Sequence, residues 1–223
     1  MKNNLYLYNL ILSSKLINYP DTNTILGPEA SVVYYLFKYS KDLYINYPRI
    51  FRHPSVITDS YTSMNLYFSL LSHSSNILFL DYKDKNNISF KYFDYHFHIR
   101  HINNPDLILY KYNNSTKDEY NGVKFNLPTI EGAIAYCFSL YSNNFNIDDL
   151  FDACVLIALY SEKLSNNILL SYLLQLQINV KKVMKKSINH FKLLNFDSLA
   201  YFDIAPDDYK TNIHATLGFC HGG

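Results

Sequence analysis

The sequence is poor in glycine, cysteine and charge, and it contains no tryptophan. Among its 223 residues there are 6 Gly and 3 Cys, and 17% of the side chains are charged. The glycine-rich patterns GxGxxG, GxxxxGK[ST] and GxSxG do not occur, and neither does the zinc-protease pattern HExxH. The chain therefore carries none of these local signatures of nucleotide binding or hydrolysis.

The three cysteines are Cys137, Cys154 and Cys220, and their spacing matches neither CxxC nor a zinc finger. Cys137 and Cys154 lie inside apolar runs, where a thiol behaves as a small hydrophobic side chain. We expect reduced, structural thiols in a cytoplasmic protein.

Long hydrophobic segments are also missing. The longest apolar run, residues 150–160, is about half the length that a membrane span needs, and it contains Asp152. Residues 1–20 include the polar Asn9, and no small-residue cleavage site follows them, so we expect no signal peptide. These features predict a soluble cytoplasmic protein without a membrane partner.

The charges nearly cancel. Lys and Arg total 20 and Asp and Glu total 19, so the formal charge is +1. This balance argues against a wholly basic surface that would trap nucleic acid, although a local patch is still allowed. Asn (25 residues) and Tyr (22 residues) supply the polar surface, but both have A/T-rich codons, so genome composition explains their abundance as well as a binding role does.

The hydrophobic period predicts an α+β fold. The segment Gly27-Pro28-Glu29 starts a helix that reaches about residue 39, and a second helix starts at Asp59 or Ser60. From residue 76 the period is that of strands, which we expect at 77–80, 88–93, 96–101, 107–112 and 123–127, with a polar loop at 113–119. The pattern predicts a central, mostly antiparallel sheet of about four to five strands with a helical segment before it.

After Pro128 the period becomes helical and stays so. Helix starts are expected at Thr129, at Asn146 or Asp148, and at Ser165, and a fourth helix covers about residues 180–194. These elements predict a C-terminal bundle of about four helices. We expect residues 1–57 to form an N-terminal helical segment and residues 58–223 to form the α+β core with the C-terminal helices.

The densest histidine cluster is His96-Phe97-His98-Ile99-Arg100-His101. On a strand His96 and His98 share one face, which gives a usable pair of metal ligands. The spacing supplies no third ligand, and an exposed polar strand explains the same pattern. We therefore expect no metal site and no cofactor.

The predicted helix 180–194 is basic on one side. At 100° per residue its five lysines fall within an arc of about 140°, and apolar residues occupy the opposite arc. No acidic residue occurs between Glu162 and Asp197. The face is either ordinary solvated surface or a contact for an anionic partner, which would be a nucleic-acid backbone or an acidic protein surface. The five lysines are Lys181, Lys182, Lys185, Lys186 and Lys192.

Two short segments carry a resemblance to a known family. Residues 60–66 read SYTSMNL and residues 122–133 read GVKFNLPTIEGA, and a helical tail follows from 148 to 194. In this order, over about residues 58–195, they resemble the motifs "hisTAL..hGL" and "g..i.va..eRAllD" and the helical tail of AbiEi-type antitoxins. Those proteins pair with nucleotidyltransferase-like toxins in type IV toxin–antitoxin systems.

The resemblance implies a non-enzymatic antitoxin that neutralises such a toxin, represses its own operon as a DNA-binding transcription regulator, or does both. The family normally carries an N-terminal winged helix-turn-helix, so residues 1–57 are either a plain helical segment or a degenerate winged helix. The helix at 28–39 offers only Glu29 and Lys38 as charges, whereas Lys41, Arg49 and Arg52 could contact phosphate from a loop.

Two other classes of function stay open. One is a phage-defence or host-interaction binding protein without DNA binding. The other is a metal-dependent enzyme whose site is assembled from His96, His98 and distant acids.

Overall fold

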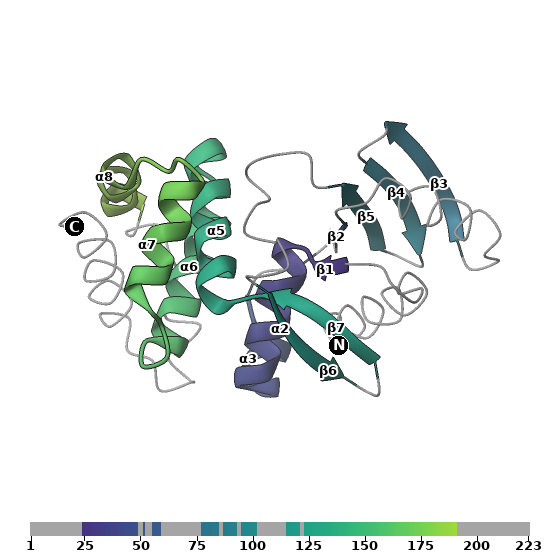
Figure 1. Ribbon diagram of the computed structural model, residues 1–223, viewed down its shortest axis with the longest axis horizontal. Helices are drawn as coiled ribbons and strands as arrows, with labels where there is room; N and C mark the ends of the chain where they lie inside the picture. Colours follow the sequence, from purple (N-terminus) through teal and green to yellow (C-terminus); the bar gives the residue numbers. More distant parts are fainter. Residues whose placement is uncertain are drawn as a thin grey trace. The chain divides into compact units, whose positions relative to one another are not determined.

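The computed structural model describes residues 24–48, 51, 55–58, 77–84, 87–92, 95–101, 115–120 and 123–190 (Figure 1). Helices and strands both occur, as expected of an α+β protein. Internal contacts divide the chain into two units: Met1–Tyr34 with Ile50–Pro128, and Tyr35–Arg49 with Thr129–Gly223. The expected boundary after residue 57 stays a prediction.

The first unit contains a mixed sheet with the strand order β3-β4-β5-β2-β1-β7-β6. The central pairs β1–β7 and β2–β5 are parallel, whereas β1–β2, β3–β4, β4–β5 and β6–β7 are antiparallel. The strands are β1 (Thr24–Leu26), β2 (Ser55–Thr58), β3 (Ile77–Asp84), β4 (Asn87–Tyr92), β5 (Tyr95–His101), β6 (Ser115–Tyr120) and β7 (Val123–Pro128).

The sheet has more strands than the four or five expected. The central strands β1 and β2, of 3 and 4 residues, come from the N-terminal part of the chain. Strands this short contain too little alternation of apolar and polar residues to be recognised in a sequence. Other expected segments, the helix after residue 59 and the strand at 107–112, lie outside the described residues.

The polar loop expected at 113–119 was wrong, because residues 115–120 form strand β6. Its sequence STKDEY has no apolar alternation, but it pairs with β7 along its length, from Ser115 opposite Pro128 to Tyr120 opposite Val123. β6 ends the strand order, and charged residues are common in edge strands, where they discourage pairing with another chain.

The hairpin expected after residue 76 is confirmed. β3 and β4 pair antiparallel and close with Asp84 opposite Asn87, and β5 continues the ladder with Ile99 opposite Ile88. Both isoleucines are fully buried. Their burial ties the hairpin and β5 to the core of the first unit.

Helix α2 (Pro28–Tyr39) begins where the sequence predicted, directly after β1. Gly27 donates its backbone N–H to the carbonyl oxygen of Ser55 over 2.7 Å, which brings the turn against β2. The buried Ser31 hydroxyl donates to the Gly27 carbonyl oxygen at 2.7 Å. The first helical turn is therefore fixed to the end of β1.

Unit two holds α3 (Lys41–Asn46), α5 (Ile130–Asn144), α6 (Ile147–Tyr160), α7 (Asn166–Gln175) and α8 (Val180–His190). The expected caps are confirmed: Thr129, Asn146 and Ser165 accept hydrogen bonds from backbone N–H groups of the helices that follow them. The short α3, capped by Ser40, was not expected. Within the described part of the chain, no helix combines the length and the apolar character needed to cross a membrane.

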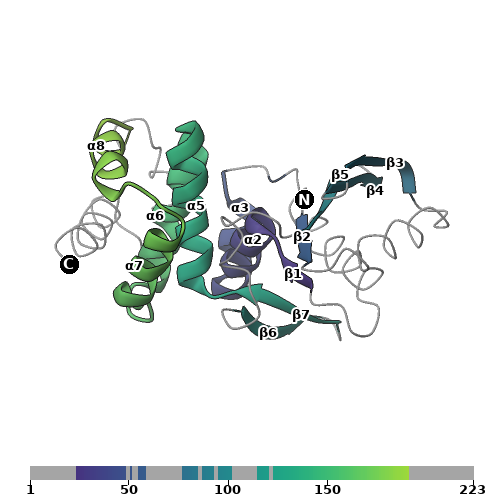
Figure 2. The same ribbon diagram turned by 45° about the horizontal axis from the view of Figure 1, so that its top comes forward.

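In the second unit α5 contacts each of α6, α7 and α8, and Figures 1 and 2 show the four helices grouped together. The buried Glu131 carboxylate accepts the backbone N–H of Ser165 at 2.9 Å, which joins the start of α5 to the start of α7. Tyr47 donates its hydroxyl to the buried Asp152 carboxylate at 2.9 Å. These bonds between distant segments stabilise one arrangement of the helices.

Candidate functional site

The lysine face of α8 is the candidate site, and it consists of the exposed Lys181, Lys182, Lys185 and Lys186. The helix turns its other side inward, because Val183 and Ser187 are each only 1% exposed. The exposure of these four lysines and the burial of Val183 agree with the expected basic and apolar sides. Lys192, the fifth expected residue, lies outside the described residues.

Two of the four lysines lie at the N-terminal end of α8, where a positive charge is unfavourable. The N-terminal end of a helix dipole is positive, and a cation there costs roughly 0.3–1 kcal/mol. Lys181 and Lys182 nevertheless occupy the first turn of α8, which contains no acidic residue. The cap is favourable, since the Asn179 side-chain oxygen accepts the N–H of Lys182 at 2.9 Å. Helix stability alone does not explain this placement.

An aromatic ring lies beneath two of the four lysines. The ammonium nitrogens of Lys182 and Lys186 are 5.2 Å and 5.1 Å from the ring centroid of Phe145. At this range the negative face of a ring attracts a cation. Phe145 is the half-buried residue that ends α5. The lysine face is therefore built from α8 and from the C-terminal end of α5.

The last turn of α8 is held by Tyr141 of α5. Its hydroxyl lies 2.8 Å from Nδ1 of His190, and the two rings make an edge contact with centroids 5.8 Å apart. Tyr141 also meets Phe145 edge-on at 5.6 Å. The C-terminal end of α5 therefore contacts α8 near its start, at Lys182, and near its end, at His190.

Burial also changes the acidity of phenols in this unit. Desolvation, with a smaller contribution from Cys154, raises the pKa of Tyr141 to about 12. Desolvation, with a smaller contribution from Tyr39, raises the pKa of Tyr160 to about 12. Tyr160 donates its hydroxyl to the Tyr35 carbonyl oxygen at 2.8 Å, a bond that needs the protonated phenol.

These shifts predict a loss of stability at high pH. The unfolded chain releases the Tyr141 and Tyr160 protons near pH 10.0, before the folded protein does at about 12, so the free energy of unfolding should fall across that window. Thermal midpoints measured between pH 9 and pH 12, roughly, should decline less steeply in the variant Tyr141→Phe/Tyr160→Phe than in the parent. If the thermal midpoints of the parent and the variant declined equally with pH, the raised pKa values of Tyr141 and Tyr160 would be contradicted.

Cys154 does not offer a nucleophile. The thiol is fully buried in α6, and desolvation, together with the nearby Asp152 charge, raises its pKa well above the ordinary value. A nucleophilic cysteine needs the thiolate form. This thiol, and the buried thiol of Cys137, fit the expected structural role.

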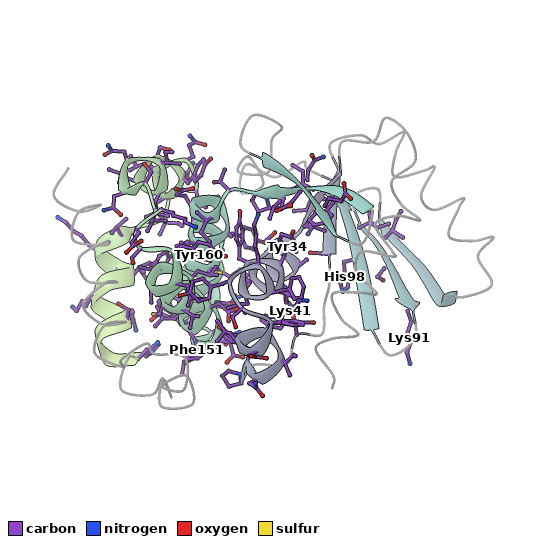
Figure 3. The ribbon with its side chains drawn as sticks, turned by 90° about the horizontal axis from the view of Figure 1, so that it is seen from below. Tyr34, Lys41, Lys91, His98, Phe151 and Tyr160 are labelled. Atoms are coloured by element: carbon purple, nitrogen blue, oxygen red, sulfur yellow. The ribbon has the colours of Figure 1, made fainter. Side chains whose placement is uncertain are left out.

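Of the three expected phosphate contacts, Lys41 alone lies within the described residues. Lys41, labelled in Figure 3, was expected in a loop, but it opens α3. Its ammonium nitrogen lies 5.8 Å from the ring centroid of Phe37. The correction follows from the Ser40 cap, whose side chain accepts the N–H of Leu43 and starts a helix. Arg49 and Arg52 lie outside the described residues.

The histidine cluster lies on β5, as expected. His98 is partly buried and sits opposite Ser89 of β4 and Ser55 of β2, and Lys91 marks the neighbouring β4 in Figure 3. The His96 side chain is not among those described. Among the residues that are described, no group of three His, Cys, Asp or Glu side chains could hold a metal ion.

Sequence reasoning missed Phe145, Tyr141 and His190. Each lies in a stretch whose pattern indicates only a helix or its end, and nothing local marks it as part of a site. Phe145 and the lysines that it contacts are brought together by the packing of α5 and α8.

Comparison with known proteins adds no relative. A scan against protein-family models finds no match, and a search of curated proteins finds no significant match either. The resemblance to AbiEi-type antitoxins therefore stays a prediction. Its first motif, residues 60–66, lies outside the described residues, and the described part of the second, residues 123–133, runs through β7 into the start of α5.

Proposed function

We propose that this protein is a cytoplasmic, non-enzymatic binding protein of the antitoxin type, which uses the lysine face to bind an acidic protein surface. The exposed lysine face, on a helix without acidic residues and with its other side buried, is the observation that carries the proposal. The partner class, a nucleotidyltransferase-like toxin, is taken from the resemblance. The proposal also treats α5–α8 as one C-terminal bundle of about four helices.

A protein partner fits the lysine face better than a nucleic acid does. Phe145 adds an aromatic surface beside the charges, and aromatic residues flanked by polar ones are typical of protein interfaces. Lysine stems also cover apolar surface while the charge stays in water. Repression of an operon would instead require the protein to bind DNA.

The experiment replaces the lysine face by glutamine in the full chain. Lys181→Gln, Lys182→Gln, Lys185→Gln and Lys186→Gln together should leave the thermal midpoint almost unchanged, because Gln and Lys have similar helix propensities. Affinity for the toxin should fall by roughly 10- to 100-fold, since each exposed charge pair contributes about 0.2–1 kcal/mol. Rescue of growth from a co-expressed nucleotidyltransferase-like toxin should then be lost.

Three exposed lysines outside α8 provide a control, which removes three charges against four in the lysine-face variant. The variant Lys38→Gln/Lys41→Gln/Lys163→Gln removes positive charge from the same unit but not from the lysine face. It should keep both affinity and rescue. If the lysine-face variant also binds and rescues like the parent, the lysine face is only solvated surface and the proposed function is wrong.

A further inference from the structure

The backbone of Phe145 is unusual for a phenylalanine. Its φ of 49° and ψ of 32° place it in the left-handed region at the end of α5, where Gly or Asn is the common residue. A bulky side chain there is disfavoured. The N–H of Phe145 donates to the Tyr141 carbonyl oxygen at 2.7 Å, a bond that any residue at this position could make. The ring, and not this backbone bond, is therefore what distinguishes phenylalanine from the usual residue here.

The ring of Phe145 orders two like charges. Lys182 and Lys186 are four residues apart on α8, where like charges repel and lower helix stability. Both ammonium groups nevertheless lie within 5.2 Å of the same ring centroid. The ring restricts the rotamers of two long side chains before any partner arrives, and a partner then loses less conformational entropy on binding.

Lys181 and Lys185 form an internal comparison. Like Lys182 and Lys186, they are four residues apart on α8 and exposed. Among the described residues, however, no aromatic ring contacts their ammonium groups. The two pairs carry the same charge. A difference in their effect on binding therefore does not come from the number of charges removed.

We infer, on the basis of the proposed function, that Lys182, Phe145 and Lys186 form a preorganised cation pair for two carboxylates spaced four residues apart on an acidic helix of the partner. Residues four apart on any α-helix rise by about 6 Å, so the acidic helix repeats the spacing of the lysine pair. Phe145 is a positioning residue, because it acts on the partner through the two lysines.

The first experiment compares the two lysine pairs against one probe. The probe is a helical peptide of about 20 residues with Glu at positions four apart, and binding is measured by fluorescence anisotropy. Lys182→Gln/Lys186→Gln should weaken binding about tenfold, and Lys181→Gln/Lys185→Gln about threefold or less. Equal losses would overturn the inference but leave the proposed function standing, whereas no loss in either variant would contradict both.

The second experiment changes the ring without changing charge. Phe145→Leu should weaken peptide binding about threefold, which is the difference expected between an ordered and an unordered lysine pair, whereas Phe145→Tyr should keep the parent affinity, because its aromatic face is still present. In NMR spectra the ε-methylene protons of Lys182 and Lys186 should carry a ring-current shift that Phe145→Leu abolishes and Phe145→Tyr keeps. Wild-type affinity of Phe145→Leu, or unchanged shifts, would overturn the inference.

A DNA duplex of about 20 base pairs is the competing probe. For phosphate contacts, log affinity falls with log salt by about 0.9 per contact. We expect the duplex to bind more weakly than the acidic peptide at the same ionic strength. Tighter duplex binding, with a salt slope that drops on removal of Lys182 and Lys186, would overturn the carboxylate assignment.

Discussion

Replacing Gly27 by alanine is expected to destabilise the first unit by about 3 kcal/mol, because a Cβ at this position has no room. The added atom would lie 1.9 Å from the Ser55 hydroxyl oxygen and 2.8 Å from the Ser55 carbonyl oxygen. The clash cannot be relieved without loss, since the carbonyl oxygen accepts the N–H of Gly27. Hydrogen exchange in β1 and β2, and the urea midpoint of the full chain, should report the loss.

The second substitution Ser55→Gly identifies the source of that loss. It removes the hydroxyl oxygen and the Cβ of Ser55 and leaves the carbonyl oxygen in place, so Gly27→Ala/Ser55→Gly should recover part of the stability relative to Gly27→Ala. No recovery would mean that the side-chain clash is not the cause. Wild-type stability of Gly27→Ala would refute the close approach of the turn to β2.

Replacing Tyr141 by alanine should cost the second unit about 4 kcal/mol, a typical value for the loss of a buried aromatic ring. The side chain is completely buried, meets Phe145 edge-on and bonds His190. Its loss should also loosen α8 from α5, because it removes the contact at the last turn of α8. Urea unfolding gives the energy, and hydrogen exchange in residues 180–190 gives the loosening.

Tyr141→Phe separates the ring from the hydroxyl. It keeps the packing and removes only the bond to His190, so its cost should be about 1 kcal/mol. If Tyr141→Ala and Tyr141→Phe cost the same, the hydroxyl and not the ring accounts for the stabilisation. If hydrogen exchange in α8 is as slow in both variants as in the parent, Tyr141 does not hold the lysine face in place.

Local signals were enough to predict many of the elements. Thr129 and Ser165 precede helices and bond N–H groups three residues later, so the signal and its effect lie within one turn. The β3–β4 hairpin was predicted for a similar reason, since two runs of alternating residues flank a short polar turn. The change of period at Pro128 also falls at a boundary between the two units.

Elements that depend on distant partners could not be predicted. β1 is too short to show a pattern, and it exists because Ile25 pairs with both Ile57 and Asn126. The polar strand β6 depends in the same way on its ladder with β7. A ladder of backbone hydrogen bonds joins main-chain groups that almost every residue type carries, so it leaves little mark on the sequence of a strand.

The candidate site also has one part that the sequence predicts and another that only helix packing determines. The helical period of residues 180–190 was sufficient to put four lysines on one side of α8, because residues of one helix need no other element to share a face. The ring beneath Lys182 and Lys186, and the bond of Tyr141 to His190 across 49 residues, depend on how α8 packs against α5. Periodicity acts over a few residues of one helix, whereas contacts between helices are determined by the packing of the whole core.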